Sequence, residues 1–217
     1  MNEEQAPARA GSENNEGLQR NDFRTVLDLV EPGSRVLDLG CGDGTLLQLL
    51  RARKQASGYG VEMDQRLIME CIARGLSVFQ GNLDEGLRDF EDQSFDYVIL
   101  NQTLPAVHRP AYVMDEMLRV GKMGIVSFPN FACWRVRWHL LTRGRMPVDE
   151  IIPYEWYDTP NIHHLTVVDF EEFCRKQGVA IRRAFYFRQL SRGHAVTRML
   201  RPNLRAGYAL FVIAREP

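Results

Sequence analysis

The sequence predicts an α/β fold with a seven-stranded, mostly parallel sheet and helices on both of its faces. Short, continuously apolar segments alternate with segments of helical periodicity between residues 23 and 177. The first apolar segment runs directly into a glycine-rich loop, and the last two are joined by an arginine-rich connection. Apolar strands that alternate with amphipathic helices are typical of a parallel sheet covered on both faces.

Length and composition indicate one globular domain, residues 22–217, after a disordered tail, residues 1–21. The chain has 217 residues, 45% of them hydrophobic, and a formal net charge of −1. It can therefore bury a full core, and it has no global field that would attract nucleic acid or an anionic membrane. No segment approaches the ~18 uninterrupted apolar residues of a membrane span, and the start does not resemble a signal peptide. We expect a cytoplasmic protein.

The elements are expected in alternating order. The leading helix has apolar residues at Phe23, Val26, Leu27 and Val30, and a Pro-Gly turn ends it. Strands are expected at 35–39, 59–61, 76–80, 95–100, 124–128, 179–187 and 208–214, and further helices at 45–54, 65–74, 110–120 and 169–177. Residues 129–165 interrupt this rhythm, so we interpret them as an insertion.

The cysteines suggest neither a zinc site nor a disulfide framework. They are widely spaced and form no C-x-x-C pair. Reduced, buried thiols are expected at all four positions, Cys41, Cys71, Cys133 and Cys174.

A glycine-rich loop follows the first strand. It contains Gly40, Cys41, Gly42 and Gly44, and Asp38 lies two residues before the first glycine. Glycine lets backbone approach a ligand closely, and ligands of such sheets bind at the carboxyl ends of the strands. Dinucleotide folds use G-x-G-x-x-G for a pyrophosphate, whereas this loop has G-x-G-x-G and an acid that suits the ammonium of a methionine moiety. S-adenosylmethionine (SAM) therefore fits better than NAD, and a plain tight turn is the alternative.

The second strand ends in an acid that can bind a ribose. Glu62, followed by Met63, lies 18 residues beyond Gly44, close to the ~20 residues expected for a ribose-binding acid. Its carboxylate can accept hydrogen bonds from both ribose hydroxyls. A solvated acid at the end of a strand is the alternative.

Polar residues also follow the third and fourth strands. Asn82 and Leu83 occupy the loop where the adenine edge is expected, and an Asn side chain can bond the exocyclic amine or a ring nitrogen. Asn101 is expected beside the methyl-transfer face, although a plain loop fits the fourth strand end equally well.

Residues 23–128 resemble the class I SAM-dependent methyltransferase family in the glycine loop, in Glu62 and in the Ser-Phe-Asp-Tyr-Val segment at 94–98. The resemblance implies the Rossmann-like fold of that family and binding of SAM or S-adenosylhomocysteine. More of the chain resembles one branch, the MetW family. The segments that carry this second resemblance are 37–46, 82–87, 127–131, 143–148 and 156–163.

The MetW resemblance implies a role in methionine biosynthesis, in which the protein accompanies and supports a homoserine O-acyltransferase of the MetX type. It does not establish methyl transfer, so a methyltransferase that acts on a small molecule is the alternative function. Asn82 departs from the family pattern, in which Asp is common at this position. That departure puts the strength of the adenine contact in doubt.

No catalytic residue is assigned, because methyl transfer from a sulfonium needs mainly alignment of the acceptor. The loop after the fourth strand lacks the Asn-Pro-Pro-aromatic segment of amino-directed methyltransferases, so amide methylation is not expected. His108 more simply bonds nearby backbone or solvent. His163 and His164 are adjacent, so on a strand they would point to opposite faces and could not readily chelate one metal.

The insertion is a candidate lid or docking surface. It holds all three tryptophans, and Phe131, Trp134, Trp138 and Leu141 fall at helical spacing with arginines between them. Trp, Tyr and Arg dominate binding hot spots, and a Trp-Tyr pair follows at 156–157. The alternative is that the tryptophans complete the core over the sheet.

The connection between the last two strands is basic. Residues 182–205 contain seven arginines and no acid. RNA binding is the specific alternative, but a solvated loop or an acidic protein partner agrees better with a net charge near zero. We expect neither nucleic acid nor a membrane as a partner.

Overall fold

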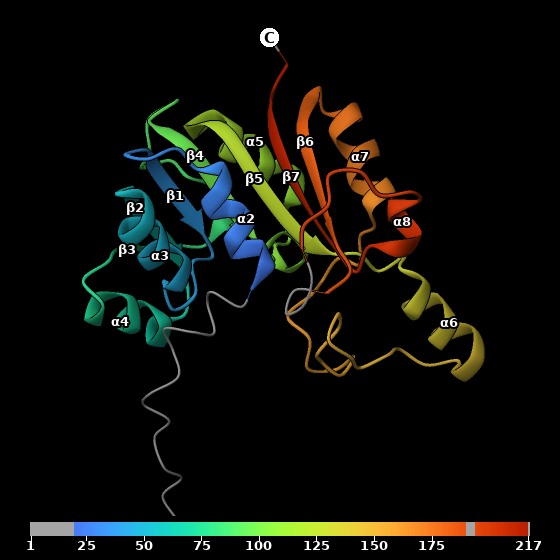
Figure 1. Ribbon diagram of the computed structural model, residues 1–217. Helices are drawn as coiled ribbons and strands as arrows, with labels where there is room; N and C mark the ends of the chain where they lie inside the picture. Colours follow the sequence, from blue (N-terminus) through green and yellow to red (C-terminus); the bar gives the residue numbers. More distant parts are fainter. Residues whose placement is uncertain (1–19, 190–193, 217) are drawn as a thin grey trace, which may run out of the picture.

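The computed structural model describes residues 20–189 and 194–216 (Figure 1). The predicted tail lies outside the described residues except for its last two positions. Of these, Arg20 precedes the first described helix and Asn21 begins it.

Seven strands form one sheet in the order β3-β2-β1-β4-β5-β7-β6. They are β1 (Arg35–Leu39), β2 (Ser57–Glu62), β3 (Ser77–Gln80), β4 (Phe95–Asn101), β5 (Gly121–Pro129), β6 (Val179–Phe187) and β7 (Tyr208–Arg215). The first five strands are parallel, and β7 is antiparallel to both β5 and β6. The predicted seven-stranded, mostly parallel sheet is therefore confirmed.

Helices cover both faces of this sheet (Figure 1). They are α2 (Asn21–Leu29), α3 (Thr45–Lys54), α4 (Gln65–Ala73), α5 (Pro110–Val120), α6 (Trp134–Arg143), α7 (Val167–Lys176) and α8 (Pro202–Arg205), with short 3-10 turns η1 (Leu83–Glu85) and η2 (Leu104–Ala106). One core cluster packs α2 and α3 against the sheet, and another packs α5 and α7. Within the described ranges, no helix is both long and apolar enough to cross a membrane.

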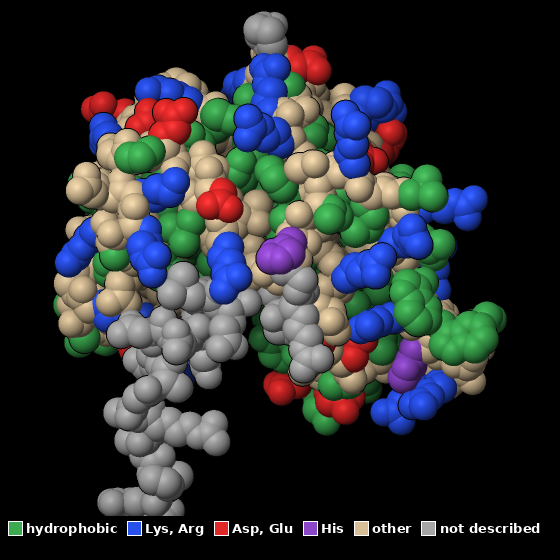
Figure 2. Space-filling view, in the orientation of Figure 1, with side chains coloured by type: hydrophobic (Ala, Val, Ile, Leu, Met, Phe, Trp, Pro, Cys, Tyr) green, Lys and Arg blue, Asp and Glu red, His purple; other side chains and the backbone are tan. Residues whose placement is uncertain are grey.

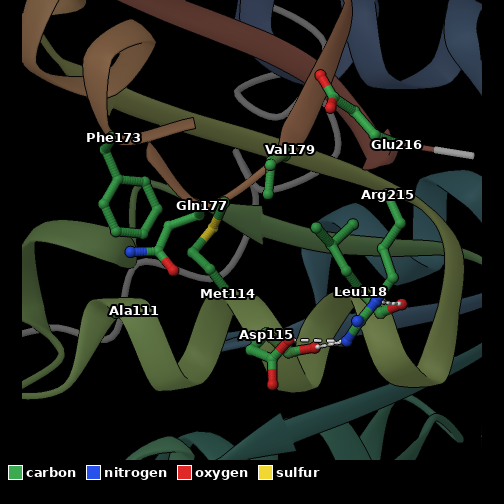
Figure 3. Close-up of a pocket in the computed structure, with 10 residues that line it drawn as sticks. Ala111, Met114, Asp115, Leu118, Phe173, Gln177, Val179, Arg215 and Glu216 are labelled. Carbon is green, nitrogen blue, oxygen red and sulfur yellow. Dashed lines mark hydrogen bonds and ion pairs between the residues drawn. The ribbon is translucent and has the colours of Figure 1, made fainter. Parts of the chain in front are cut away.

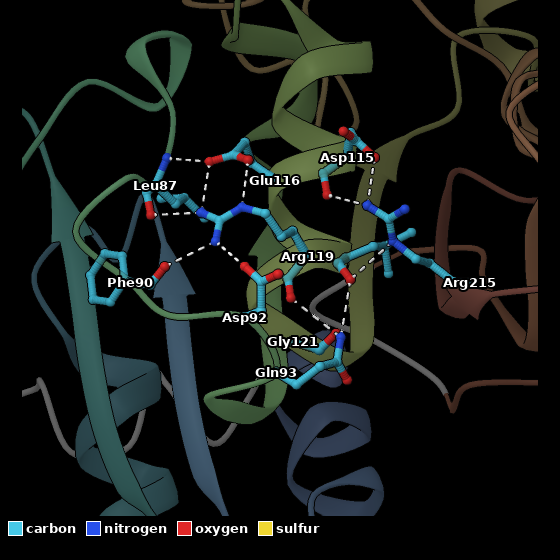
Figure 4. Close-up of polar contacts among 10 residues, drawn as sticks. Leu87, Phe90, Asp92, Gln93, Asp115, Glu116, Arg119, Gly121 and Arg215 are labelled. Atoms are coloured by element: carbon cyan, nitrogen blue, oxygen red, sulfur yellow. Dashed lines mark hydrogen bonds and ion pairs between the residues drawn. The ribbon is translucent and has the colours of Figure 1, made fainter.

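The connection from β3 to β4 is held against α5 by one arginine (Figure 4). Arg119 donates to the carboxylates of Glu116 and Asp92, and to the carbonyl oxygens of Leu87 at 2.9 Å and Phe90 at 3.0 Å. The hydrogen bonds from Arg119 outweigh burial and lower the pKa of Glu116. Since this network fixes the segment that follows η1, it also fixes the loop in which the adenine contact is predicted.

The insertion between β5 and α7 carries α6, which is the helix with the least buried surface among the long ones. Val136 is the single buried residue of α6. Trp134 is 52% exposed, Trp138 61% and Trp156 75%. The alternative in which the tryptophans complete the core is therefore wrong, because α6 projects from the carboxyl end of β5 instead of lying on the sheet (Figure 1).

Candidate functional site

The strands β2, β1 and β4 are neighbours, so the residues that follow them meet at one edge of the sheet. Asp38 of β1 pairs with Gly60 of β2 on one side and with Ile99 of β4 on the other. The loop after β1 stays close to β2, because the N–H of Gly40 donates to the carbonyl of Val61 at 2.8 Å. The topology thus brings together the loop, the predicted ribose acid and the end of β4.

The three glycines of the loop all have left-handed backbone, with φ of +72° at Gly40, +57° at Gly42 and +79° at Gly44. A Cβ on Gly40 would lie 2.7 Å from the side chain of Thr103, and one on Gly44 would overlap with the side chain of Leu76. A Cβ on Gly42 would have nothing within 4 Å. Packing therefore requires the outer two glycines, and the central glycine leaves its backbone open to a ligand.

Cys41 directs its thiol into the protein. The thiol belongs to a small buried cluster with Leu47, Cys71 and Leu76. Burial is the main cause that raises the pKa of Cys41, followed by the charge of Asp38, so the thiol stays protonated. Any contact between Cys41 and a ligand would come from its backbone. All four thiols are free and buried, as predicted.

Asp38 has a buried carboxylate without a hydrogen-bond donor. Its side chain is on a residue that is 3% exposed, and nothing in the described part of the chain donates a hydrogen bond or forms an ion pair with it. Burial, together with the negative charge of Glu62, raises the pKa of Asp38 to about 7, although the positive charge of Arg20 opposes this rise. A buried carboxylate of this kind is stabilised by a cationic ligand.

Glu62 connects the glycine loop to the end of β2. One carboxylate oxygen accepts from the N–H of Gly42 at 2.9 Å, and the other accepts from the N–H groups of Met63 at 2.8 Å and Asp64 at 3.0 Å. These contacts fix the orientation of the carboxylate and still leave lone pairs for further donors. Glu62 thus has a structural function in addition to the predicted contact with a ribose.

Asn82 and Leu83 follow β3, which is the neighbour of β2. The Asn82 side chain caps η1, because its oxygen accepts from the N–H of Asp84 at 3.1 Å and its nitrogen donates to Glu85 at 3.4 Å. One lone pair of that oxygen remains for an adenine amine. Met63, 66% exposed, and Leu83, half-buried, add apolar surface at the ends of these two neighbouring strands.

Asn101 ends β4 at the predicted place, but the protein itself occupies its amide group. The amide nitrogen donates to the carboxylate of Asp22 at 3.1 Å, and the amide oxygen accepts from the hydroxyl of Ser127. Asp22 is fully buried and forms an ion pair with Arg20 at 2.6 Å. This network lies at the expected methyl-transfer face and fills it with protein groups.

Sequence reasoning missed Arg20 and Asp22. Both stand beside the assigned tail, and the leading helix was recognised from its apolar residues alone. The available signal was an acid directly before Phe23, on a helix that packs against the sheet. Arg20 is also the cation whose charge acts on Asp38, so the start of α2 contributes to the electrostatics of the cleft.

The two adjacent histidines do not lie on a strand, so the expectation that they point to opposite faces of one is wrong. The backbone N–H of His163 donates to the carbonyl of Pro105 at 2.9 Å, and its Nε2 is buried without a partner among the described residues. His164 packs edge-on against Phe131, with 4.5 Å between ring centroids. Neither histidine contacts the glycine loop or Asn101 through a hydrogen bond within the described chain.

A separate cavity of about 150 Å³ lies between α5, α7 and the end of β7 (Figure 3). Arg215, which ends β7, lines it and pairs with Asp115 at 2.7 Å. Because β7 is antiparallel to β5, its end lies near the start of the parallel strands. This cavity is therefore at the edge of the sheet opposite the glycine loop and does not belong to the candidate site.

Comparison with solved structures agrees with this architecture. A SAM-dependent methyltransferase from Thermotoga maritima, described as a possible histamine N-methyltransferase, superposes with a TM-score of 0.67 at 19% identity, over 90% of this chain and 88% of the other. A SAM-dependent methyltransferase from Archaeoglobus fulgidus superposes with a TM-score of 0.68 at 14% identity, over 94% of each chain. The fold is that of the class I SAM-dependent methyltransferases.

Comparison with protein families is more specific. The family model described as "Methionine biosynthesis protein MetW" matches residues 20–213. The bifunctional methionine biosynthesis protein MetXA/MetW of Rhodopirellula baltica is 37% identical over 204 residues, which cover 90% of this chain. The chain spans 33% of the length of that relative. The chain belongs to the MetW family of methionine biosynthesis proteins.

Proposed function

We propose that the chain binds SAM or S-adenosylhomocysteine at the carboxyl ends of β1 and β2. Asp38 would accept the ammonium, Glu62 the ribose hydroxyls and Asn82 the adenine amine, while the open backbone at Gly42 lies against the ligand. The buried carboxylate of Asp38, which lacks a donor among the described residues, supports this assignment best. The two ligands share the ammonium, ribose and adenine groups, so these residues would bind both.

We further propose that the protein is an accessory, activating subunit of a homoserine O-acyltransferase of the MetX type. The observation that carries this proposal is the relative whose name joins MetXA and MetW in one chain. Fusion keeps two domains at a high effective concentration, which is an advantage for proteins that act together. A separate MetW chain would instead need a docking surface, and the exposed aromatic residues of the insertion can supply one.

Methyl transfer to a small acceptor is the second candidate, and the structure supports it less. The fold is suitable, but an acceptor must lie beside the transferred methyl group. Asp22, Asn101 and Ser127 bond to one another at that place. An acceptor would have to displace this buried network, which includes a carboxylate already paired with Arg20.

The test is an acyltransferase assay of the cognate enzyme with and without this protein, with added SAM in half of the samples. We expect wild type to raise the acyltransferase rate and to co-purify with the enzyme. Asp38→Ala and Glu62→Ala show whether ligand binding is needed for that effect. If wild type leaves the rate unchanged and instead forms S-adenosylhomocysteine from SAM and homoserine or another small acceptor, the accessory function is wrong and the methyltransferase function replaces it.

A further inference from the structure

Three arginines surround a pocket at the start of α6. The pocket has a volume of about 240 Å³, and Arg135, Arg188 and Arg205 line it together with Cys133 and Ile151. The three guanidinium groups come from α6, from the residue after β6 and from the end of α8. We call this the arginine pocket. Its cations are far apart in the sequence, so their convergence is a product of the fold.

The positive charge of the arginine pocket is not compensated within the described residues. None of the three guanidinium groups forms an ion pair or a hydrogen bond with a described carboxylate. The nearest acids along the chain have other partners: Asp149 accepts from the N–H of Ile151 at 2.8 Å, and Glu150 accepts from Gln189 at 2.6 Å. Like charges brought together without a counter-charge favour the binding of an anion.

The start of a helix adds to this preference. Cys133 is the N-cap of α6, a helix of ten residues, and its side chain makes no capping hydrogen bond. The first N–H groups of a helix and its dipole both favour a negative charge at that end. Since Trp134 and Arg135 begin α6 and line the pocket, the helix dipole acts on the same space as the guanidinium groups.

An apolar stripe extends from the arginine pocket along α6. Trp134, Trp138 and Leu141 follow at intervals of four and three residues, so they share one face of the helix. Their exposed fractions are 52%, 61% and 79%. Figure 2 shows hydrophobic and basic side chains next to each other at the lower right, where α6 lies in Figure 1. Trp and Arg side by side on an exposed helix are typical of a protein-binding hot spot.

We propose that this surface is where the chain docks on the homoserine O-acyltransferase, an inference that rests on the function proposed above. A carboxylate side chain of the acyltransferase enters the arginine pocket, and an apolar patch beside that carboxylate covers Trp134, Trp138 and Leu141. Charge complementarity selects this occupant, because the pocket holds three cations without described counter-ions while the adjoining stripe is apolar. A Glu or Asp next to exposed apolar side chains satisfies both parts at once.

The test compares substitutions on this surface with matched substitutions elsewhere. The test variants are the pair Arg135→Glu with Arg205→Glu, and the pair Trp138→Ser with Leu141→Ser. The control variants, Arg66→Glu and Met69→Ser, change the same kinds of exposed side chain on α4, where Met69 is 59% exposed. Affinity for the purified acyltransferase is measured by calorimetry or biolayer interferometry, and binding of S-adenosylhomocysteine reports that each variant is folded.

We expect each test pair to weaken the complex by at least ~30-fold, the size of a hot-spot effect, and each control to change the affinity by less than ~3-fold. Binding of wild type should also weaken as the salt concentration rises, and the arginine pair should reduce that dependence. Hydrogen exchange gives an independent readout: the acyltransferase should protect the amides of residues 133–143 and leave those of 65–73 unchanged.

The outcomes separate the surface from the function. If wild type binds and activates the acyltransferase and the test pairs do so equally well, the docking surface is wrong while the accessory function stands. If wild type does not bind the acyltransferase, both are wrong. If the isolated chain dimerises in sedimentation and the test pairs make it monomeric, the occupant is a second copy of this chain, which overturns the proposed docking on the acyltransferase.

Discussion

The carboxylate of Glu62 accepts a hydrogen bond of 2.9 Å from the backbone N–H of Gly42. The two residues are 20 positions apart and belong to the ends of neighbouring strands. This bond makes the shape of the glycine loop depend on the acid that is proposed to hold the ribose. Loop geometry and ligand binding should therefore respond together to a change at Glu62.

We expect Glu62→Gln to weaken binding of S-adenosylhomocysteine by at least ~10-fold, because hydrogen bonds to a charged group contribute about 1.5–3 kcal/mol. The amide keeps the shape of the side chain but has one oxygen for three N–H groups. Calorimetry measures the affinity and thermal unfolding the stability. The control is Glu85→Gln, an exposed acid beside Asn82. Equal affinity of Glu62→Gln and wild type would show that Glu62 does not bind the ligand.

Ligand affinity should depend on pH through Asp38. The pKa of Asp38 is raised from 3.8 to about 7 in the absence of ligand, and a bound ammonium would lower it. Binding then requires loss of a proton below pH 7, so affinity should fall by up to ~10-fold for each pH unit below that value and level off above it. Calorimetry between pH 5.5 and 8.5 checks this, with Glu62→Gln as a variant that keeps Asp38. A flat profile would contradict the ammonium contact.

The same carboxylate should reduce the stability of the protein at neutral pH. The folded pKa of Asp38 lies above its ordinary value, so the folded state binds the proton more tightly. The free energy of unfolding should then decrease as the pH rises from about 4 to about 7 and stay level above that. Asp38→Asn removes this decrease, and we expect it to be more stable than wild type at pH 8 by roughly 1–4 kcal/mol, with a much smaller gain at pH 4.

Urea unfolding of wild type and Asp38→Asn at both pH values measures the difference, which cancels the contributions of other titrating groups. Asp38→Asn should lose affinity for S-adenosylhomocysteine in the same preparations. A variant that is less stable than wild type at pH 8 would mean that Asp38 stabilises the fold.

Two glycines with nearly the same φ separate backbone strain from packing. Gly33 has φ of +78° and Gly44 of +79°, but a Cβ on Gly33 would have nothing within 4 Å, whereas one on Gly44 would lie 2.9 Å from the sulfur of Cys71. We expect Gly33→Ala to lower the free energy of unfolding by about 1 kcal/mol and Gly44→Ala by about 2–4 kcal/mol. Chemical denaturation checks both. Equal losses would show that the loop can relax away from α4.

The parallel part of the sheet could be predicted because its strands are short, apolar and buried on both faces, as Val98 to Leu100 illustrate. The strand β2 was predicted too short, at residues 59–61. Glycine weakens a strand signal, yet a Cβ on Gly60 would overlap with the sulfur of Cys41, so packing against the glycine loop requires a residue without a side chain.

The candidate site was predictable where one residue type has one reason to be present. Glycines followed a strand, and an acid preceded them. The orientation of Asn101 was not predictable, since its partners Asp22 and Ser127 lie 79 and 26 positions away. The exposure of α6 was not predictable either, because aromatic residues at helical spacing fit a buried face and a binding face equally well.

Asn130 lies at the carboxyl end of β5 and is fully buried. Its side chain donates to the carbonyls of Asn203 and Ala206 and accepts from the N–H groups of Ala132 and Val167. One residue thus fixes where the insertion leaves the sheet and where the chain returns. Selection can therefore reshape the solvent-facing positions of α6 for a new partner without disturbing the rest of the domain, so this segment is expected to diverge fastest when a duplicated copy acquires a different task.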